Sequence, residues 1–132
     1  MDCLQTILIV DDSPTNIKIL GELLKNQYQV LVASNAYKAL QIAKEQLPDL
    51  IIMDVIMPGM DGFEACEALK SDPHTAEIPL IYITALTNKE DIIKGFEVGG
   101  QDYITKPFNR QELFLRVRTH LELISSRKAL QR

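Results

Sequence analysis

The sequence predicts an α/β domain built around a parallel β-sheet. Short apolar runs, such as Ile7–Val10, Leu50–Met53 and Leu80–Thr84, alternate with stretches whose apolar residues recur at helical spacing. Strands that alternate with helices favour parallel pairing, in which a helix crosses over between successive strands. At 132 residues the chain fits a single domain with one core.

Five strand-then-helix units follow one another along the chain. The expected strands are Thr6–Val10, Val30–Ala33, Leu50–Met53, Leu80–Thr84 and Asp102–Ile104. The first helix is expected from Pro14, with Ser13 as its N-cap, to about Asn26. The others are a helix from Ala36 stopped by Pro48, one around Phe63–Leu69, one opened by a capping box of Thr87 and Glu90 and ended by Gly99, and one opened by Asn109 and Glu112.

The composition is that of a soluble globular protein, with 46% hydrophobic and 24% charged residues and no apolar run long enough to cross a membrane. The first residues lack the features of a signal peptide, and Cys3 and Cys66 are too few for a disulfide framework, so we expect a cytoplasmic protein. The net charge is −4. Basic residues cluster only on the last helix, which argues against direct nucleic-acid binding.

Acidic residues follow two of the predicted strands, and a lysine follows a third. Asp11 and Asp12 come directly after Ile7–Val10, Asp54 after Leu50–Met53, and Lys106 closes the fifth strand region. The carboxyl ends of parallel strands open onto one edge of a sheet, so these side chains should converge. Carboxylates brought together repel one another unless a cation lies among them, and Mg²⁺ suits such oxygen ligands. The chemistry indicated is phosphoryl transfer.

Each of these residues also has a plainer interpretation when it is taken alone. Asp11 and Asp12 are common residue types at a helix start, Lys106 is an ordinary loop residue, and Thr84 suits a strand. His74 and His120 lack the sequence context of a phosphodonor and are expected to be solvated or packing residues, and Cys66 is expected in the core. A phosphoryl donor would therefore come from another protein or domain.

Taken together, four segments resemble the receiver domain of two-component response regulators. They are Ile7–Asp12, Ile51–Gly62, Ile83–Ala85 and Asp102–Phe108, and the resemblance extends from about Thr6 to about Leu123. It implies a flavodoxin-like, doubly wound, five-stranded parallel sheet of order 2-1-3-4-5 with five flanking helices. Residues 1–123 would form the receiver domain, and residues 124–132 a helical extension or the start of a linker to an output domain.

The resemblance also implies a role for each site residue. Asp54 would be the phosphoacceptor, taking a phosphoryl group from a phosphohistidine of a histidine kinase or of a phosphotransfer protein. Mg²⁺ would be held by Asp12, Asp54 and the carbonyl of Ile56, with Asp11 acting through a coordinated water. Lys106 and Thr84 would contact the phosphoryl group, Tyr103 would turn inward as Thr84 moves, and the Lys106–Pro107 peptide bond would be cis.

The function implied is a phosphorylation-activated switch, and the chain would not be an enzyme although it would assist its own phosphorylation and dephosphorylation. Phosphorylation would change the surface formed by the fourth helix, fifth strand and fifth helix, which controls an output partner or domain. Asp102, Glu112 and Arg116 match the ion pairs of a homodimer face in winged-helix members, whereas Ile92 and Gln101 do not. Two of those pairs therefore lose a charged partner. A homodimer through this face is one possibility, and the resemblance to receivers attached to hybrid histidine kinases or to output enzymes is the other.

Two other functions use a similar sheet. A Mg²⁺-dependent phosphohydrolase with an aspartate nucleophile usually carries a second aspartate two residues later, and here that residue is Ile56. A flavin carrier would need a phosphate loop after the first strand, whereas Asp11–Pro14 has the wrong charge for one. The apolar side chains of Ile56 and Leu86 also predict a long-lived phosphoryl group. A short apolar seam of Phe114, Val117, Leu121 and Ile124 predicts a helical tail, with Ile124 past the end of the sheet.

Overall fold

The structure is a computed structural model that describes residues 4–130, with side chains through Ser126. Cys3 and the side chains of Arg127 and Lys128, two of the basic residues expected on the last helix, lie outside the described residues. The strands are β1 (Thr6–Val10), β2 (Gln29–Ala33), β3 (Leu50–Met53), β4 (Leu80–Thr84) and β5 (Asp102–Thr105). The helices are α1 (Pro14–Leu24), α2 (Ala36–Gln46), α3 (Gly62–Ser71), α4 (Lys89–Glu97) and α5 (Arg110–Leu130).

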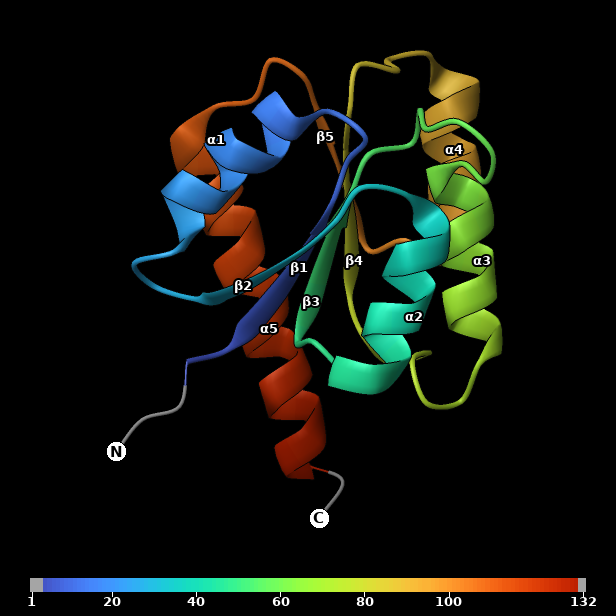
Figure 1. Ribbon diagram of the computed structural model, residues 1–132. Helices are drawn as coiled ribbons and strands as arrows, with labels where there is room; N and C mark the ends of the chain where they lie inside the picture. The colour runs from blue at the N-terminus through green and yellow to red at the C-terminus, as the bar shows by residue number, and fades with distance from the viewer. Residues whose placement is uncertain (1–3, 131–132) are drawn as a thin grey trace.

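All five strands are parallel and lie in the order β2-β1-β3-β4-β5, which confirms the predicted fold. Helices α1 and α5 cover one face of the sheet, and α2, α3 and α4 cover the other (Figure 1). The order reverses beside β1, because the chain passes from β2 back across β1 to β3. The carboxyl ends of β1 and β3 therefore lie side by side, and the loops that follow them share one edge of the sheet.

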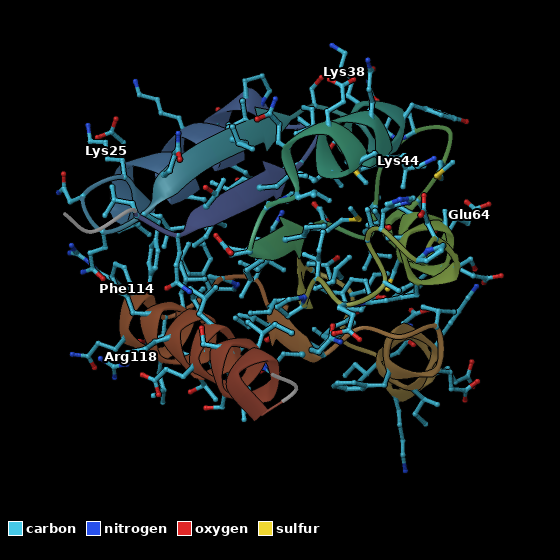
Figure 2. All side chains as sticks on the ribbon, turned by 90° about the horizontal axis from the view of Figure 1, so that it is seen from below. Lys25, Lys38, Lys44, Glu64, Phe114 and Arg118 are labelled. Carbon is cyan, nitrogen blue, oxygen red and sulfur yellow. The ribbon has the colours of Figure 1, made fainter. Side chains whose placement is uncertain are left out.

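Two apolar cores lie on the two faces of the sheet. Every residue of β3 and β4 is buried, as expected for central strands covered on both sides. Seen from below, apolar side chains fill the space between sheet and helices, while charged residues such as Lys25, Lys38 and Arg118 point outward (Figure 2). Buried Cys66 lies in the core under α2, α3 and α4, where burial raises the pKa of its thiol.

The helix starts agree with the sequence in part. Ser13 and Asn109 accept hydrogen bonds from the backbone N–H three residues later, as expected of N-caps. The predicted cap at Thr87 is wrong by one residue, because Asn88 Oδ1 accepts the bond from Asp91 N at 2.9 Å. The capping box found in the structure belongs instead to α3, between Asp61 and Glu64.

The end of α5 is packed more closely than the sequence suggested. Ile124 was expected past the end of the sheet, yet its side chain is only 8% exposed and lines a hollow with Pro48 and Pro79. These prolines precede β3 and β4 and carry the chain beyond the strand ends, so they extend the surface on which α5 rests. Within residues 4–130, no helix is both long enough and apolar enough to cross a membrane.

Gly62 allows a close approach beside the acidic edge of the sheet. Its N–H donates to the carbonyl of Val55 at 2.9 Å, which folds the loop after β3 back on itself. A Cβ atom at this position would lie 2.8 Å from Val55 Cα and would meet the carbonyl oxygen of Asp54 at a still closer approach. Both neighbours are backbone atoms, so neither can move without displacing Asp54.

We therefore predict that Gly62→Ala lowers the free energy of unfolding by about 2 kcal/mol, the range of a steric clash in a packed site. Gly21→Ala is the matched control, because nothing lies within 4 Å of a Cβ built at Gly21 in the interior of α1. It should raise the free energy of unfolding by about 0.5–1 kcal/mol through helix propensity. Urea denaturation measures both, and equal stability of Gly62→Ala and wild type would contradict the packing argument.

Candidate functional site

The aspartates predicted to converge do so at the carboxyl edge of the sheet. Asp11 and Asp12 follow β1, Asp54 follows β3, and one carboxylate oxygen from each lies within 4.8 Å of the others. Asp11 and Asp54 are buried, whereas Asp12 is exposed. The group is thus open to solvent on one side and enclosed on the other.

Backbone and side-chain donors orient the two buried carboxylates. Asp11 Oδ1 accepts from the N–H of Ser13 at 2.9 Å, and Asp11 Oδ2 accepts from Asn16 Nδ2 at 3.3 Å. Asp54 Oδ1 accepts from the N–H of Ile56 at 3.1 Å. These bonds leave the second oxygen of Asp54 free to face the group that approaches it from β5.

That group is the ammonium of Lys106, which reaches the aspartates from the loop after β5. Its Nζ lies 2.9 Å from Asp54 Oδ2 and 3.2 Å from Asp11 Oδ2. The Lys106–Pro107 peptide bond is cis, and Lys106 N donates to the carbonyl of Thr84 at 2.9 Å. Burial lowers the pKa of Lys106, but the hydrogen bonds and negative charges of Asp54 and Asp11 outweigh it, so the pKa rises above its usual value.

The charges at this edge do not balance. Lys106 supplies one positive charge against the three carboxylates, so the ionised group carries an excess of two negative charges. Carboxylate oxygens this close together are the donor set that hard divalent cations such as Mg²⁺ prefer. The residues present therefore fit a magnesium site.

Thr84 and Tyr103 meet at the backbone of Leu86, above the end of β4. The buried hydroxyl of Thr84 accepts from the N–H of Leu86 at 3.4 Å, and the hydroxyl of Tyr103 donates to the carbonyl of Leu86 at 2.9 Å. Among the described side chains, no hydrogen bond joins Thr84 to the aspartates. Burial, followed by the negative charges of Asp91 and Asp54, raises the pKa of Tyr103 to about 12, so its phenol remains a donor at neutral pH.

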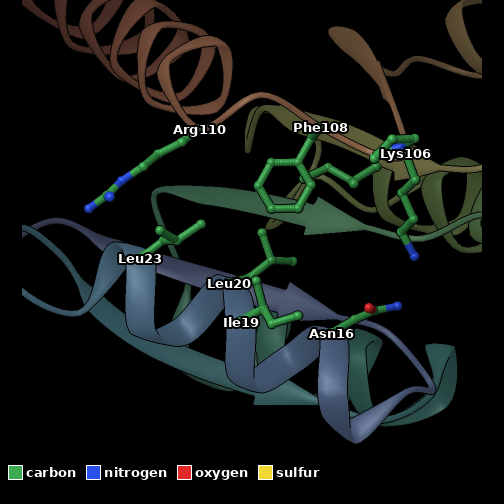
Figure 3. A pocket seen from close by; sticks show the side chains of 9 residues that line it. Asn16, Ile19, Leu20, Leu23, Lys106, Phe108 and Arg110 are labelled. Carbon is green, nitrogen blue, oxygen red and sulfur yellow. The ribbon is translucent and has the colours of Figure 1, made fainter.

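The site is flanked by apolar surface. Ile56 is 54% exposed beside Asp54, and Leu86 is half-buried. On the other flank, a hollow of about 430 Å³ lies between α1 and the loop before α5 (Figure 3). Ile19, Leu20 and Leu23 line it from α1, Phe108 and Arg110 from the loop side, and Lys106 at the end nearest the aspartates. The sequence signal for this hollow is the apolar residue Ile19 in the first helix, which the predictions above did not use; in the structure its side chain is 47% exposed.

The candidate dimer-face residues pair within one chain. Arg116 Nη1 contacts both carboxylate oxygens of Asp102, at 2.9 and 3.0 Å, and Arg116 Nη2 lies 3.7 Å from Glu112. His120 Nε2 lies 3.0 Å from Asp102 Oδ2, a contact that the sequence did not predict. This group sits at the start of β5, at the opposite end of the strand from Lys106. His74 is exposed beside Asp72.

Comparison with known proteins agrees with this geometry. The model of the response regulator receiver domain family matches residues 7–118. The response regulator PleD of Caulobacter vibrioides is 46% identical over 114 residues, which cover 86% of this chain and 25% of PleD. Protein PilH of Pseudomonas aeruginosa is 41% identical over 108 residues, which cover 81% of this chain and 89% of PilH.

Solved structures show the same fold. The crystal structure of a putative response regulator from Chloroflexus aurantiacus has a TM-score of 0.87 and 39% sequence identity, and the match covers 91% of this chain and 99% of that one. The chain spans about a quarter of the length of PleD, so it corresponds to one part of that longer protein. The acidic edge, the lysine beside it and the sheet order are thus accounted for together: this chain belongs to the response regulator receiver domain family, whose members are signalling domains.

Proposed function

We propose that this chain is a phosphorylation-activated switch in which Asp54 accepts a phosphoryl group from a phosphohistidine of a histidine kinase or of a phosphotransfer protein. The observation that carries the proposal is the 2.9 Å contact between Lys106 Nζ and Asp54 Oδ2. It places a cation where the oxygens of an incoming phosphoryl group would gather. Asp54 is also buried and oriented by Ile56 N, as a nucleophile must be.

The bonds that form and break in the transfer involve only Asp54 and the phosphohistidine of the donor. A carboxylate oxygen of Asp54 attacks phosphorus, the P–O bond forms, and the P–N bond to the donor imidazole breaks with its electron pair moving to nitrogen. Lys106 then pairs with a phosphoryl oxygen, and the Thr84 hydroxyl is available to donate to another. The product is an aspartyl phosphate.

Magnesium is proposed as the cofactor. Asp12 and Asp54 would hold it with the carbonyl of Ile56, and Asp11 would act through a coordinated water. When bound, the ion supplies positive charge that offsets the excess negative charge of the carboxylates and the phosphoryl oxygens. The donor chemistry supports this assignment, because the three aspartates already present oxygens within 4.8 Å of one another.

A phosphohydrolase with rapid turnover is the alternative that the site supports less well. Hydrolysis of an aspartyl phosphate needs a water lined up opposite the leaving carboxylate, and a polar side chain usually positions it. The side chains two residues after Asp54 and after Thr84 are Ile56 and Leu86, and neither can orient water. We therefore expect a long-lived phosphoryl group, suited to sustained output or to a relay.

The hollow between α1 and the loop before α5 is the proposed docking surface for the phosphodonor protein. Most of its lining side chains are apolar, and Lys106, which contacts the proposed phosphoacceptor Asp54, is part of the lining (Figure 3). Ile19 and Leu23 are one helical turn apart on α1, a spacing that suits contact with a helix of a partner.

A different surface of the domain would transmit the signal to an output partner or domain. Tyr103 and Thr84 both contact Leu86, which leads into α4, so a change at the phosphoryl group would reach the surface of α4, β5 and α5. Residues 124–132 are proposed as a helical extension toward an output domain. A homodimer through Asp102, Glu112 and Arg116 would require these residues to exchange their present partners within the chain.

The first prediction concerns the phosphoacceptor. Incubated with acetyl phosphate and Mg²⁺, the wild-type protein should gain a single phosphoryl adduct, and Asp54→Asn should gain none because its amide is not a nucleophile. Asp61→Asn is the matched control, since it alters an N-cap that asparagine also serves. Intact mass spectrometry with and without EDTA measures both requirements. An adduct on Asp54→Asn, or an undiminished adduct in EDTA, would contradict the proposal.

The second prediction concerns the lifetime of the aspartyl phosphate. Replacing both apolar neighbours, as Ile56→Asn with Leu86→Lys, should speed its hydrolysis by about tenfold or more, because both new side chains can orient water. Ile93→Asn, an equivalent change on exposed α4, should leave the rate unchanged. The decay of the mass adduct gives the rate. Slower decay in the double variant than in wild type would overturn the argument.

The third prediction concerns docking. Ile19→Asp should slow transfer from a phosphohistidine-bearing phosphotransfer protein by about tenfold, the cost of losing an apolar anchor, while phosphorylation by acetyl phosphate stays unchanged. Ile93→Asp is matched in exposure, at 46% against 47% for Ile19, and lies on the opposite face of the sheet. Radiolabelled transfer assays compare the two. Equal loss in both variants would remove the α1 hollow as the docking surface.

A further inference from the structure

The carboxylate of Asp11 is held by three hydrogen-bond donors. Its Oδ1 accepts from Ser13 N at 2.9 Å, whereas its Oδ2 accepts both from Lys106 Nζ at 3.2 Å and from Asn16 Nδ2 at 3.3 Å. An ionised carboxylate only accepts hydrogen bonds, so the nitrogen of the Asn16 amide is the atom that faces it. Because Asp11 is buried, its orientation depends on these donors within the protein.

The two donors on Asp11 Oδ2 differ in how firmly they are placed. The ammonium of Lys106 ends a flexible four-carbon stem and also lies 2.9 Å from Asp54. Asn16 lies in the first turn of α1, where its backbone N–H donates to the capping hydroxyl of Ser13 at 3.3 Å. Its short side chain therefore starts from a fixed helical turn. Asn16 is the fixed donor of the pair, and Lys106 is the one that can move.

Phosphorylation of Asp54, as proposed above, would change the partners of Lys106, because its ammonium then pairs with a phosphoryl oxygen. Asp11 Oδ2 would lose its charged donor while the carboxylate remains buried. Ser13 N on Oδ1 and Asn16 Nδ2 on Oδ2 would then hold one oxygen each, and two such bonds fix the rotation of the carboxylate about its Cβ–Cγ bond. The lone pair that Lys106 leaves becomes available to the coordinated water through which Asp11 is proposed to act.

We propose that Asn16 is a positioning residue of the phosphorylation site: it holds the carboxylate of Asp11 in place while Lys106 passes from Asp11 to the phosphoryl group. This inference rests on the proposed function. Asn16 acts through Asp11, because its side chain makes no hydrogen bond to Asp12 or Asp54 among the described residues. Its contribution should be small while Lys106 is on Asp11 and larger after Lys106 has left.

Asn16 also lines the hollow between α1 and the loop before α5, and its amide lies at the same end of that hollow as the ammonium of Lys106 (Figure 3). Slower transfer from a phosphodonor protein in an Asn16 variant would therefore not distinguish docking from positioning. Measurements without a partner protein isolate the role of Asn16 at the aspartates.

The first test uses the protein without metal or phosphoryl group and asks whether Asn16 and Lys106 share Asp11. Urea denaturation compares Asn16→Ala in the wild type and in Lys106→Ala. The shift of the midpoint should be about twice as large in the Lys106→Ala background, because Oδ2 then loses both of the donors that the structure gives it. Thr15→Ala, an exposed neighbour on α1, is the matched control and should shift the midpoint equally in both backgrounds. An equal or smaller shift for Asn16→Ala in Lys106→Ala would overturn the shared contact.

The second test asks whether Asn16 contributes most after Lys106 has moved. Isothermal titration calorimetry measures the dissociation constant of Mg²⁺ and then, at saturating Mg²⁺, that of the phosphoryl analogue beryllofluoride. Asn16→Ala should raise the constant for Mg²⁺ by about threefold at most, and that for beryllofluoride by about tenfold, the effect of one hydrogen bond to a charged group. Thr15→Ala should change neither constant.

The two ligands together separate positioning from a general loss of structure. An equal or larger loss for Mg²⁺ than for beryllofluoride, or no loss for beryllofluoride, would overturn the positioning role of Asn16. A wild-type protein that binds no beryllofluoride would instead count against the proposed function, and the urea experiment would still decide whether Asn16 and Lys106 share Asp11.

Discussion

Three carboxylates at one edge of a sheet are the constraint around which this domain is organised. The parallel arrangement brings the ends of β1 and β3 together, and their aspartates repel one another without a cation between them. Lys106 offsets one charge, and its raised pKa records how strongly Asp54 and Asp11 hold the ammonium. The remaining negative charge suits the divalent cation that the proposed function requires beside the phosphoryl group.

The same constraint shapes the loops around the edge. Gly62 lets the chain after β3 fold back so closely that Asp54 is enclosed on one side, and Ile56 is left exposed on the other. Backbone atoms of the loop therefore form the enclosed side of the site near Asp54, and the apolar side chain of Ile56 lines its solvent-exposed side. The proposed acyl phosphate would be shielded from water by this packing, so the same backbone contacts that orient Asp54 would also favour slow hydrolysis.

The sequence predicted what depends on chain order, and it missed what depends on how side chains meet. Apolar runs located the strands, and parallel pairing then required Asp11, Asp12, Asp54 and Lys106 to converge. The contact of His120 with Asp102 joins a helix to the start of a strand 18 residues earlier, and no local pattern predicts it. The cap at Asn88 and the burial of Ile124 likewise depend on backbone angles and on prolines from distant loops. In the sequence, Tyr82 is one residue of an apolar strand. Its hydroxyl bonds to the carbonyl of Gly95, and Gly95 and Gly100 leave space for its ring, only because the chain folds α4 onto the sheet.

The contacts of β5 explain why the structural change proposed to follow phosphorylation of Asp54 would reach α4. The first residue of the strand, Asp102, is held by Arg116 and His120 of α5, and Lys106, just past its other end, is held by the aspartates. A strand fixed beyond both ends cannot slide, so the freedom that remains near its middle is that of the Tyr103 side chain. Tyr103 reaches the entrance of α4 through the carbonyl of Leu86, and the hydroxyl of Tyr82 holds the exit of that helix at the carbonyl of Gly95. Under the proposed phosphorylation, a change in charge at Asp54 would therefore reach the molecular surface first at the entrance of α4, where Tyr103 and Thr84 both contact Leu86.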